Sequence, residues 1–249
     1  MSFQQTMDKL KNLKLNGFVC ALQEQMQTTS THILAFEDRL ALLVDAEVDY
    51  RNINRENRLR KAAKFKHTGA YKEDVDYVSH RGLDRSAIES LFLCHWIKLW
   101  QNIFLIGPTG TGKSWLACAM GNEAIRKNHK VRFYRFPQLL EDMDIARKDG
   151  TLPHLRGQLV KLDLLIIDDW AVCAINSQGR HDFLEIVEHF YNKGALIITT
   201  QLPLENWHEY LGEPTQADSI LDRIVHNAHQ ISIKGESMRK LQGLKGGQQ

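Results

Sequence analysis

The sequence predicts an α/β fold in which a five-stranded parallel sheet is flanked by helices and preceded by a small all-helical domain. Two observations carry this prediction. Short apolar or β-branched runs alternate with helical stretches in the second part of the chain, and this alternation is typical of parallel sheets covered on both faces. The first part shows only the three- and four-residue apolar spacing of amphipathic helices. We therefore expect a helical domain over residues 1–70 and an α/β domain over residues 71–249.

The N-terminal part predicts two helices, the first over residues 7–27 and the second from about Phe36 toward Lys66. The later half of the second helix, "RNINRENRLRKAAKFK", holds seven Lys or Arg against one Glu. Such a block is either a solvated helix face or a cationic helix that contacts phosphate backbones, and the two readings stay open.

The second part predicts strands separated by helices. A first helix is expected to begin at Ser86, which forms a capping box with Glu89. Strands are expected at residues 102–107, 130–136, 162–169, 194–201 and 229–233, and helices at about 113–128, 138–160, 180–192 and 216–227.

Composition places the chain among ordinary globular proteins, with 43% hydrophobic and 25% charged residues. No apolar run approaches membrane-spanning length, and the start "MSFQQTMDKLKNLK" is too polar for a signal peptide, so we expect a cytoplasmic protein without a membrane partner. The net charge of +2 permits nucleic-acid binding without arguing for it.

Cysteine and histidine spacing indicates neither a disulfide framework nor a zinc site. The four cysteines contain no CxxC pair, and His226 and His229 have no HExxH or cysteine partner. We expect reduced, mostly buried thiols at Cys20, Cys94, Cys118 and Cys173.

The stretch "GPTGTGKS" fits the phosphate-binding pattern GxxxxGK[ST] between an expected strand and an expected helix. Its glycines let backbone N–H groups converge on phosphates at a helix N-terminus. Lys113 would reach the β- and γ-phosphate oxygens, and the Ser114 hydroxyl would bind Mg²⁺. The expected nucleotide-binding residues are Gly107, Pro108, Thr109, Gly110, Thr111, Gly112, Lys113, Ser114 and Trp115.

A second acidic element, "LDLLIIDDW", reads as a buried strand ending in two carboxylates. One alternative is that Asp168 and Asp169 only cap the next element. Beside a phosphate loop we expect Asp168 to order the water shell of Mg²⁺ and Asp169 to orient the attacking water. The strand "ALIITTQLP" ends in Thr199, Thr200 and Gln201, which could touch the γ-phosphate or that water. No NKxD guanine signature is present, so we expect ATP rather than GTP.

An ordered set of segments resembles the IstB family, the ATPase helpers of bacterial insertion sequences, which are similar to DnaC-type helicase loaders within the AAA+ ATPases. The resemblance covers almost the whole chain. It is carried by "NGFVCALQEQ", "FEDRLALLVDAE", "RENRLRKAAKFK", "RGLDRSAI", "WIKLWQNIFLIGPTGTGKSWLA", "LLIIDDW", "IITTQLP", "SILDRIVH" and "ESMRK".

The resemblance implies further site residues. The "IITTQ" strand would lie between the loop strand and the "LLIIDD" strand, making Thr200 and Gln201 the first sensor. Arg223 would be an arginine finger that reaches ATP on a neighbouring subunit, the alternative being a helix arginine paired with Asp218 or Asp222. Arg239 would be the second sensor.

The sequence departs from this family pattern in two places. After the last strand only "KGESMRKLQGLKGGQQ" follows, so we expect no separate helical lid and an Arg239 on a short appended helix. Ala171 follows "DDW", where the resembling proteins favour Gly.

DNA contacts in the resembling proteins come from an insertion after the second strand and from the N-terminal helices. Acidic neighbours at Glu141, Asp142 and Asp144 weaken the case for the insertion. The candidate phosphate contacts are Arg55, Arg58, Arg60, Lys61, Lys64, Arg147, Lys148 and Arg156.

The resemblance implies an ATPase that uses ATP and Mg²⁺, self-assembles on duplex DNA as a homo-oligomer and delivers that DNA to a partner transposase. A replicative helicase loader is the alternative within the same class. A small-molecule P-loop kinase would need an arginine-rich lid that does not stand out. A DNA-binding module with a merely structural nucleotide site is disfavoured by the intact Lys113, Ser114, Asp168 and Asp169.

Overall fold

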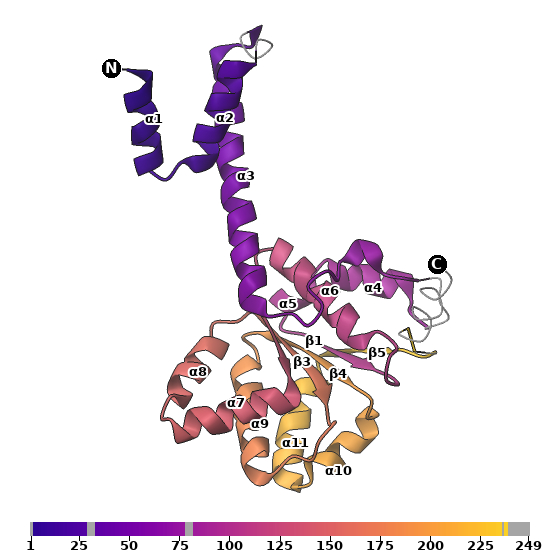
Figure 1. Ribbon diagram of the computed structural model, residues 1–249. Helices are drawn as coiled ribbons and strands as arrows, with labels where there is room; N and C mark the ends of the chain where they lie inside the picture. Colours follow the sequence, from indigo (N-terminus) through magenta and orange to yellow (C-terminus); the bar gives the residue numbers. More distant parts are fainter. Residues whose placement is uncertain (1, 29–32, 78–81, 236, 239–249) are drawn as a thin grey trace, which may run out of the picture. The chain divides into compact units, whose positions relative to one another are not determined.

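The computed structural model describes residues 2–28, 33–77, 82–235, 237 and 238. The chain divides into two compact units, residues 1–58 and 59–249. Figure 1 traces the chain with its helices and strands labelled.

The first unit consists of helices α1 (Phe3–Asn12) and α2 (Asn16–Gln27) and the larger part of α3 (Phe36–Ala63). The single helix expected over residues 7–27 is thus two helices, because the chain turns at Lys14, whose φ is 59°. Gly17 lets α2 approach α3 closely: a Cβ there would come within 2.6 Å of the Ala46 carbonyl oxygen.

The boundary between the units lies within α3, earlier than the expected boundary at residue 70. The physical reason is packing. Leu59, Ala63, Phe65 and Ala70 all contribute to the hydrophobic core on one face of the sheet. The end of α3 and the segment after it therefore belong to the α/β unit.

The α/β unit is built on a five-stranded sheet with the order β2-β3-β4-β1-β5, and every pairing is parallel. β4 lies between β1 and β3, as the resemblance implies. Each expected strand is present with ends shifted by a residue or two. The strands are β1 (Asn102–Ile106), β2 (Val131–Arg135), β3 (Leu164–Trp170), β4 (Ala195–Thr200) and β5 (Ala228–Ser232).

The helices differ from expectation in three places. α4 is capped by the Asp84 side chain, which accepts from the N–H groups of Ser86 and Ala87, so the expected capping box at Ser86 is wrong. The helix expected over residues 138–160 is split by a turn at Gly150, whose φ is 72°. α10 was not expected. The helices of this unit are α4 (Arg85–Phe92), α5 (His95–Lys98), α6 (Lys113–Arg126), α7 (Phe136–Lys148), α8 (Leu152–Leu159), α9 (Ser177–Phe190), α10 (Trp207–Leu211) and α11 (Pro214–Val225), with 3₁₀ turns η2 (Lys72–Asp74) and η3 (Leu204–Asn206).

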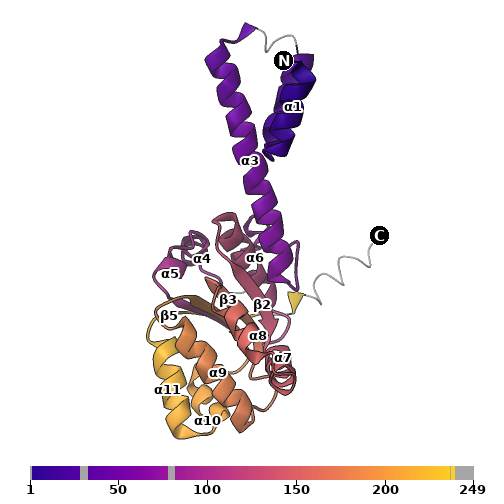
Figure 2. The same cartoon turned by 90° about the vertical axis from the view of Figure 1, so that its left-hand side faces the viewer.

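Two hydrophobic cores cover the two faces of the sheet, because successive strand side chains point to opposite faces. Ile103 and Leu105 of β1 pack with α4, α5 and α6, whereas Phe104 packs with α7, α9, α10 and α11. Figures 1 and 2 show these two helical layers on opposite sides of the sheet. Because the strands are parallel, their carboxyl ends lie at the same edge of the sheet, where the loops that follow them come together.

The position of the unit boundary predicts different stabilities for two truncated proteins. Residues 59–249 should unfold cooperatively. Residues 71–249 should unfold at a temperature lower by about 10 °C, since losing a buried aromatic such as Phe65 costs about 3 kcal/mol or more. Circular dichroism melts of both fragments check this. Equal melting temperatures would show that residues 59–70 are not part of the α/β core.

Candidate functional site

The phosphate loop joins β1 to the start of α6, at the carboxyl edge of the sheet. Gly110 and Gly112 have φ values of 83° and 93°. This left-handed backbone favours glycine, and it turns successive N–H groups toward one another as an anion-binding loop requires. The Thr111 hydroxyl donates to the Pro108 carbonyl oxygen at 2.9 Å, which closes the loop.

Lys113 lies inside this loop and is buried. Its Nζ donates to the carbonyl oxygens of Gly107 and Pro108 at 2.8 and 2.7 Å. Burial lowers the pKa of Lys113, and the carboxylates of Asp168 and Asp169 oppose that shift. The carbonyl oxygens that hold this ammonium carry no net charge. An incoming phosphate, which is negatively charged, can therefore replace them as the partner of the ammonium.

The chain after β5 returns to the phosphate loop and explains why two of its glycines are required. The Ile233 N–H donates to the Ile106 carbonyl oxygen at 2.7 Å, and the Met238 N–H donates to the Gly110 carbonyl oxygen at 2.8 Å. A Cβ on Gly107 would lie 2.0 Å from the Ile233 carbonyl oxygen, and one on Gly110 would lie 2.2 Å from the Ser237 hydroxyl. Gly107 and Gly110 are therefore needed both for close packing against the chain after β5 and for the approach of a phosphate to the loop backbone.

Asp168 is the centre of the polar site and is fully buried at the end of β3. Its Oδ1 accepts hydrogen bonds from the Ser114 hydroxyl and the Thr199 hydroxyl, both at 2.6 Å. A serine hydroxyl beside a carboxylate is a set of hard oxygen donors of the kind that Mg²⁺ prefers. The donor set therefore fits the metal expected from the sequence.

Asp169 reaches the same site because β3 is irregular there. Side chains on successive strand residues normally point to opposite faces, but the pairing of β3 with β4 shifts register between Ile167 and Trp170. Asp169 has a φ of 60° in this bulge, and its Oδ2 lies 3.0 Å from Arg135 Nε and 4.0 Å from Lys66 Nζ. Its N–H donates to the Thr199 hydroxyl at 3.2 Å.

Ala171 also has left-handed backbone, with a φ of 62°. Non-glycine residues other than Asn and Asp rarely adopt this conformation. The geometry gives a physical reason for the Gly that the resembling proteins favour at this position.

Thr199, rather than Thr200, is the threonine that contacts the acidic pair. The Thr200 hydroxyl donates to the Trp170 carbonyl oxygen and accepts from the Leu202 N–H, both at 3.0 Å. Gln201 is exposed just after β4. Adjacent strand residues face opposite ways, so only one of the two threonines can meet Asp168, and the assignment of Thr200 as the sensing side chain does not match this geometry.

Lys66 and Arg135 contact the acidic pair and were not expected in the site. Lys66 Nζ lies 3.0 Å from Asp168 Oδ2. Lys66 is the last residue of the basic block and lies just after α3, where charge alone left a solvated face and a phosphate contact both open. Arg135 ends β2, the neighbour of β3, so the strand order would have revealed it once known.

Arg223 lies on α11 and is held within its own chain. It donates to the Ser219 carbonyl oxygen at 2.7 Å and lies 3.3 Å from Glu188 on α9. Its partner is therefore Glu188 and neither of the alternatives, Asp218 or Asp222. Arg239 lies outside the described residues.

The basic residues of the insertion are engaged with acids. Arg147 pairs with the buried Asp182, and Arg156 lies 3.2 Å from Glu185 and 3.9 Å from Asp182. Lys148 lies 2.7 Å from Asp144. The pairs of Arg147 and Arg156 join α7 and α8 to α9, and they count against these two arginines as phosphate contacts, whereas the Lys148 pair lies within α7.

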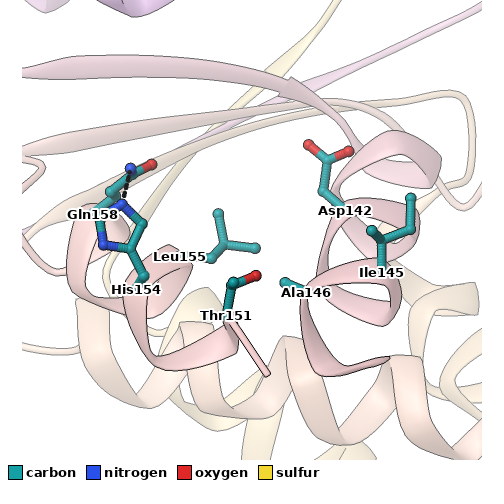
Figure 3. A pocket seen from close by; sticks show the side chains of 7 residues that line it. All are labelled: Asp142, Ile145, Ala146, Thr151, His154, Leu155 and Gln158. Carbon is teal, nitrogen blue, oxygen red and sulfur yellow. Dashed lines mark hydrogen bonds between the residues drawn. The ribbon is translucent and has the colours of Figure 1, made fainter. Parts of the chain in front are cut away.

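A surface pocket of about 260 Å³ between α7 and α8 is lined by neither Lys nor Arg. In Figure 3 the side chains from α7 and α8 face each other across it, and Gln158 is hydrogen-bonded to His154. Its titratable lining residues are Asp142 and His154, and a pocket with a carboxylate and no Lys or Arg does not favour an anionic ligand.

The basic residues of α3 present a different picture. Arg55, Arg58 and Lys61 are exposed, as is Lys64 just after the helix, and no ion pair to any of them is found within residues 2–28, 33–77 and 82–235. Arg60 is an exception, because its guanidinium packs over the Tyr71 ring at 5.1 Å.

Other kinds of site find no support in the part of the chain that the structure describes. That part holds no group of three or more His, Cys, Asp or Glu arranged for a metal ion, and no helix long and apolar enough to cross a membrane. The cysteines are free, with Cys94 and Cys118 buried, Cys173 half-buried and Cys20 exposed.

Comparison with solved structures shows the fold. The chain is similar to the DnaC helicase loader (TM-score 0.51, 18% identity, covering 60% of this chain and 87% of that one). It is also similar to DnaI (TM-score 0.54, 20% identity, covering 67% of this chain and 92% of that one). The fold is that of the P-loop AAA+ proteins, as expected.

Comparison with sequences shows the family. The insertion sequence ATP-binding protein y4pL of Sinorhizobium fredii is 43% identical over 237 residues, covering 95% of this chain and 96% of that protein. The ATP-binding protein of insertion sequence IS1162 from Pseudomonas fluorescens is 41% identical over 203 residues, covering 82% and 88%. The family described as IstB-like ATP binding protein matches residues 8–246, and the chain belongs to this family of ATP-binding proteins.

Proposed function

We propose that the protein is an ATP-hydrolysing regulator of transposition that assembles on duplex DNA and delivers that DNA to a partner transposase. One observation carries the proposal. The chain belongs to the IstB-like ATP-binding family, and five polar side chains converge at the carboxyl edge of its sheet: Lys113, Ser114, Asp168, Asp169 and Thr199.

The phosphate loop, residues 107–115, would hold the triphosphate of ATP at the start of α6. Lys113 would exchange its two carbonyl partners for phosphate oxygens. Ser114 and Asp168 would hold Mg²⁺, which neutralises charge that develops on the transferred phosphoryl group.

Hydrolysis needs a positioned water, and Asp169 is the group suited to orient it. Its Oδ2 is engaged by Arg135, whereas no partner of Oδ1 is found among the described residues. Thr199 links the two acids by donating to Asp168 and accepting from the Asp169 N–H. A movement of one carboxylate is therefore transmitted to the other through the Thr199 hydroxyl.

Within one chain the site holds the cations Lys113, Lys66 and Arg135. Arg223 is 29% exposed and paired with the exposed Glu188, a contact that water screens. Releasing Arg223 to the ATP of a neighbouring subunit would exchange this contact and its hydrogen bond to the Ser219 carbonyl oxygen for contacts with phosphate oxygens. Such an arginine stabilises transition-state charge and makes activity depend on assembly.

Duplex DNA would be contacted by exposed cations in the last turns of α3 and just after it, since the described residues place no acidic partner on Arg55, Arg58, Lys61 or Lys64. Contacts of this kind position the duplex without reading bases, and they weaken as salt rises. A helicase loader is the second candidate, favoured by the likeness in fold to DnaC and DnaI. It would bind single strands in preference to duplex DNA.

Replacing Lys113 by alanine should abolish ATP binding and, with it, ATP-dependent assembly on DNA. Titration with a fluorescent ATP analogue and sedimentation with duplex or single-stranded DNA measure the two properties. Arg85→Ala, on the exposed start of α4, is the control and should behave as wild type. ATP-dependent assembly of the Lys113→Ala protein would contradict the proposal, and preference for single strands would favour the loader.

Replacing Thr199 by valine should slow hydrolysis by about 10- to 100-fold at saturating ATP, because the hydroxyl orients both acids. Thr200→Val is the matched control. It loses hydrogen bonds to Trp170 and Leu202 and should lose stability while keeping most of its activity per folded molecule. Steady-state phosphate release and thermal melts of both proteins separate these outcomes. The reverse pattern would restore Thr200 as the sensor.

If Arg223 acts on a neighbouring subunit, two inactive variants should complement each other. Asp169→Asn and Arg223→Ala proteins should each hydrolyse ATP poorly, and a mixture should recover activity at interfaces that combine an intact Asp169 with an intact Arg223. Glu188→Gln, which leaves Arg223 present, should remain active. Phosphate release over a range of mixing ratios is the measurement, and its failure to rise at any ratio argues against a shared site.

A further inference from the structure

We propose that Lys66 makes metal binding conditional on nucleotide. Its ammonium competes with Mg²⁺ for Asp168, so that the site rejects the bare ion and accepts it only together with ATP. The inference deepens the proposed function and rests on ATP binding at the phosphate loop. It assigns a specificity-determining role to a residue that neither the phosphate loop nor the acidic strand contains.

The contact geometry makes the competition direct. Asp168 Oδ1 is already taken by the hydroxyls of Ser114 and Thr199. Asp168 Oδ2 is taken by Lys66 Nζ at 3.0 Å. The carboxylate is fully buried, so no further face is open to solvent. A cation that binds this carboxylate must therefore displace either the hydroxyls or the ammonium.

Lys66 is aimed at Asp168 by the anchored segment that carries it. Phe65, the preceding residue, is buried in the core against Gly121 of α6. The Cys118 thiol of α6, whose pKa burial raises to about 11, contacts the N–H groups of His67 and Lys66. The Asn122 side chain donates to the Ala70 carbonyl oxygen at 2.8 Å.

These anchors all lie on the helix that follows the phosphate loop. The backbone of residues 65–70 is therefore held on that helix, and displacement of the ammonium requires only the Lys66 side chain to move. That side chain is 31% exposed, so it has a path to solvent.

The charges around the site decide which metal species can enter. Asp168 and Asp169 carry two negative charges, and Lys66, Arg135 and Lys113 supply three positive charges near them. Bare Mg²⁺ would meet this surplus of positive charge and would leave the Lys66 ammonium without its partner. The complex of Mg²⁺ with ATP instead brings phosphate oxygens, to which the displaced ammonium can move.

The ion pair between Lys66 and Asp168 also stabilises the protein when no metal is bound. A buried carboxylate without a cationic partner is strongly destabilising. Lys66 supplies that partner, and it is the ligand-free protein that needs it most.

The test compares Lys66→Gln with wild type and uses Lys193→Gln, at an exposed lysine between α9 and β4, as the control. Binding of Mn²⁺, a paramagnetic substitute for Mg²⁺, is measured by electron paramagnetic resonance on full-length protein without nucleotide. Lys66→Gln should bind Mn²⁺ about tenfold more tightly or better, since one competing charge has been removed. Lys193→Gln should match wild type. Lys66→Arg, which keeps the charge, should also bind the bare ion weakly.

Thermal melts of the same proteins give a second readout. Lys66→Gln should be less stable than wild type without metal, and Mg²⁺ alone should raise its melting temperature while leaving that of wild type unchanged. Equal Mn²⁺ affinity in folded Lys66→Gln and wild type would overturn the inference, as would a Lys66→Arg protein that binds the bare ion as tightly as Lys66→Gln. These results need no ATP, so they are distinct from a failure of the proposed ATP binding, which the Lys113→Ala titration reports.

Discussion

The buried carboxylate of Asp168 is the constraint on which the rest of the site depends. It joins three parts of the chain that are far apart in sequence: Ser114 at the start of α6, Thr199 near the end of β4, and Lys66 after α3. Burying a charge is costly unless it is paired and hydrogen-bonded. The loop, the strand and the segment after α3 are therefore held together by the same need to satisfy one anion.

The architecture around Asp168 follows from the strand order. Placing β4 between β1 and β3 sets Thr199 beside both acids, and the bulge in β3 turns Asp169 into the same space. The chain after β5 closes on Gly107 and Gly110 from the other side. The phosphate loop is thus in contact with residues that follow the last strand.

The sequence could predict the features that are encoded in short stretches of residues. The phosphate loop, the acidic strand and all five strands follow from local patterns, and the resemblance placed β4 correctly. Features that depend on tertiary packing were out of reach. The contact of Lys66 with Asp168 joins positions about a hundred residues apart, the choice of Thr199 over Thr200 depends on which face of β4 meets the acids, and the unit boundary depends on where Phe65 packs. Charge counting likewise could not show that Arg147 is paired with a buried acid.

The central claim is that the ATP site is completed between subunits on DNA. Electron cryomicroscopy of the protein with duplex DNA and a non-hydrolysable ATP analogue tests it most directly. The account predicts ordered assemblies only when both are present, with Arg223 of one subunit released from Glu188 and placed at the phosphates bound by its neighbour. Assemblies that form without nucleotide, or in which Arg223 stays on Glu188 of its own chain, would contradict it.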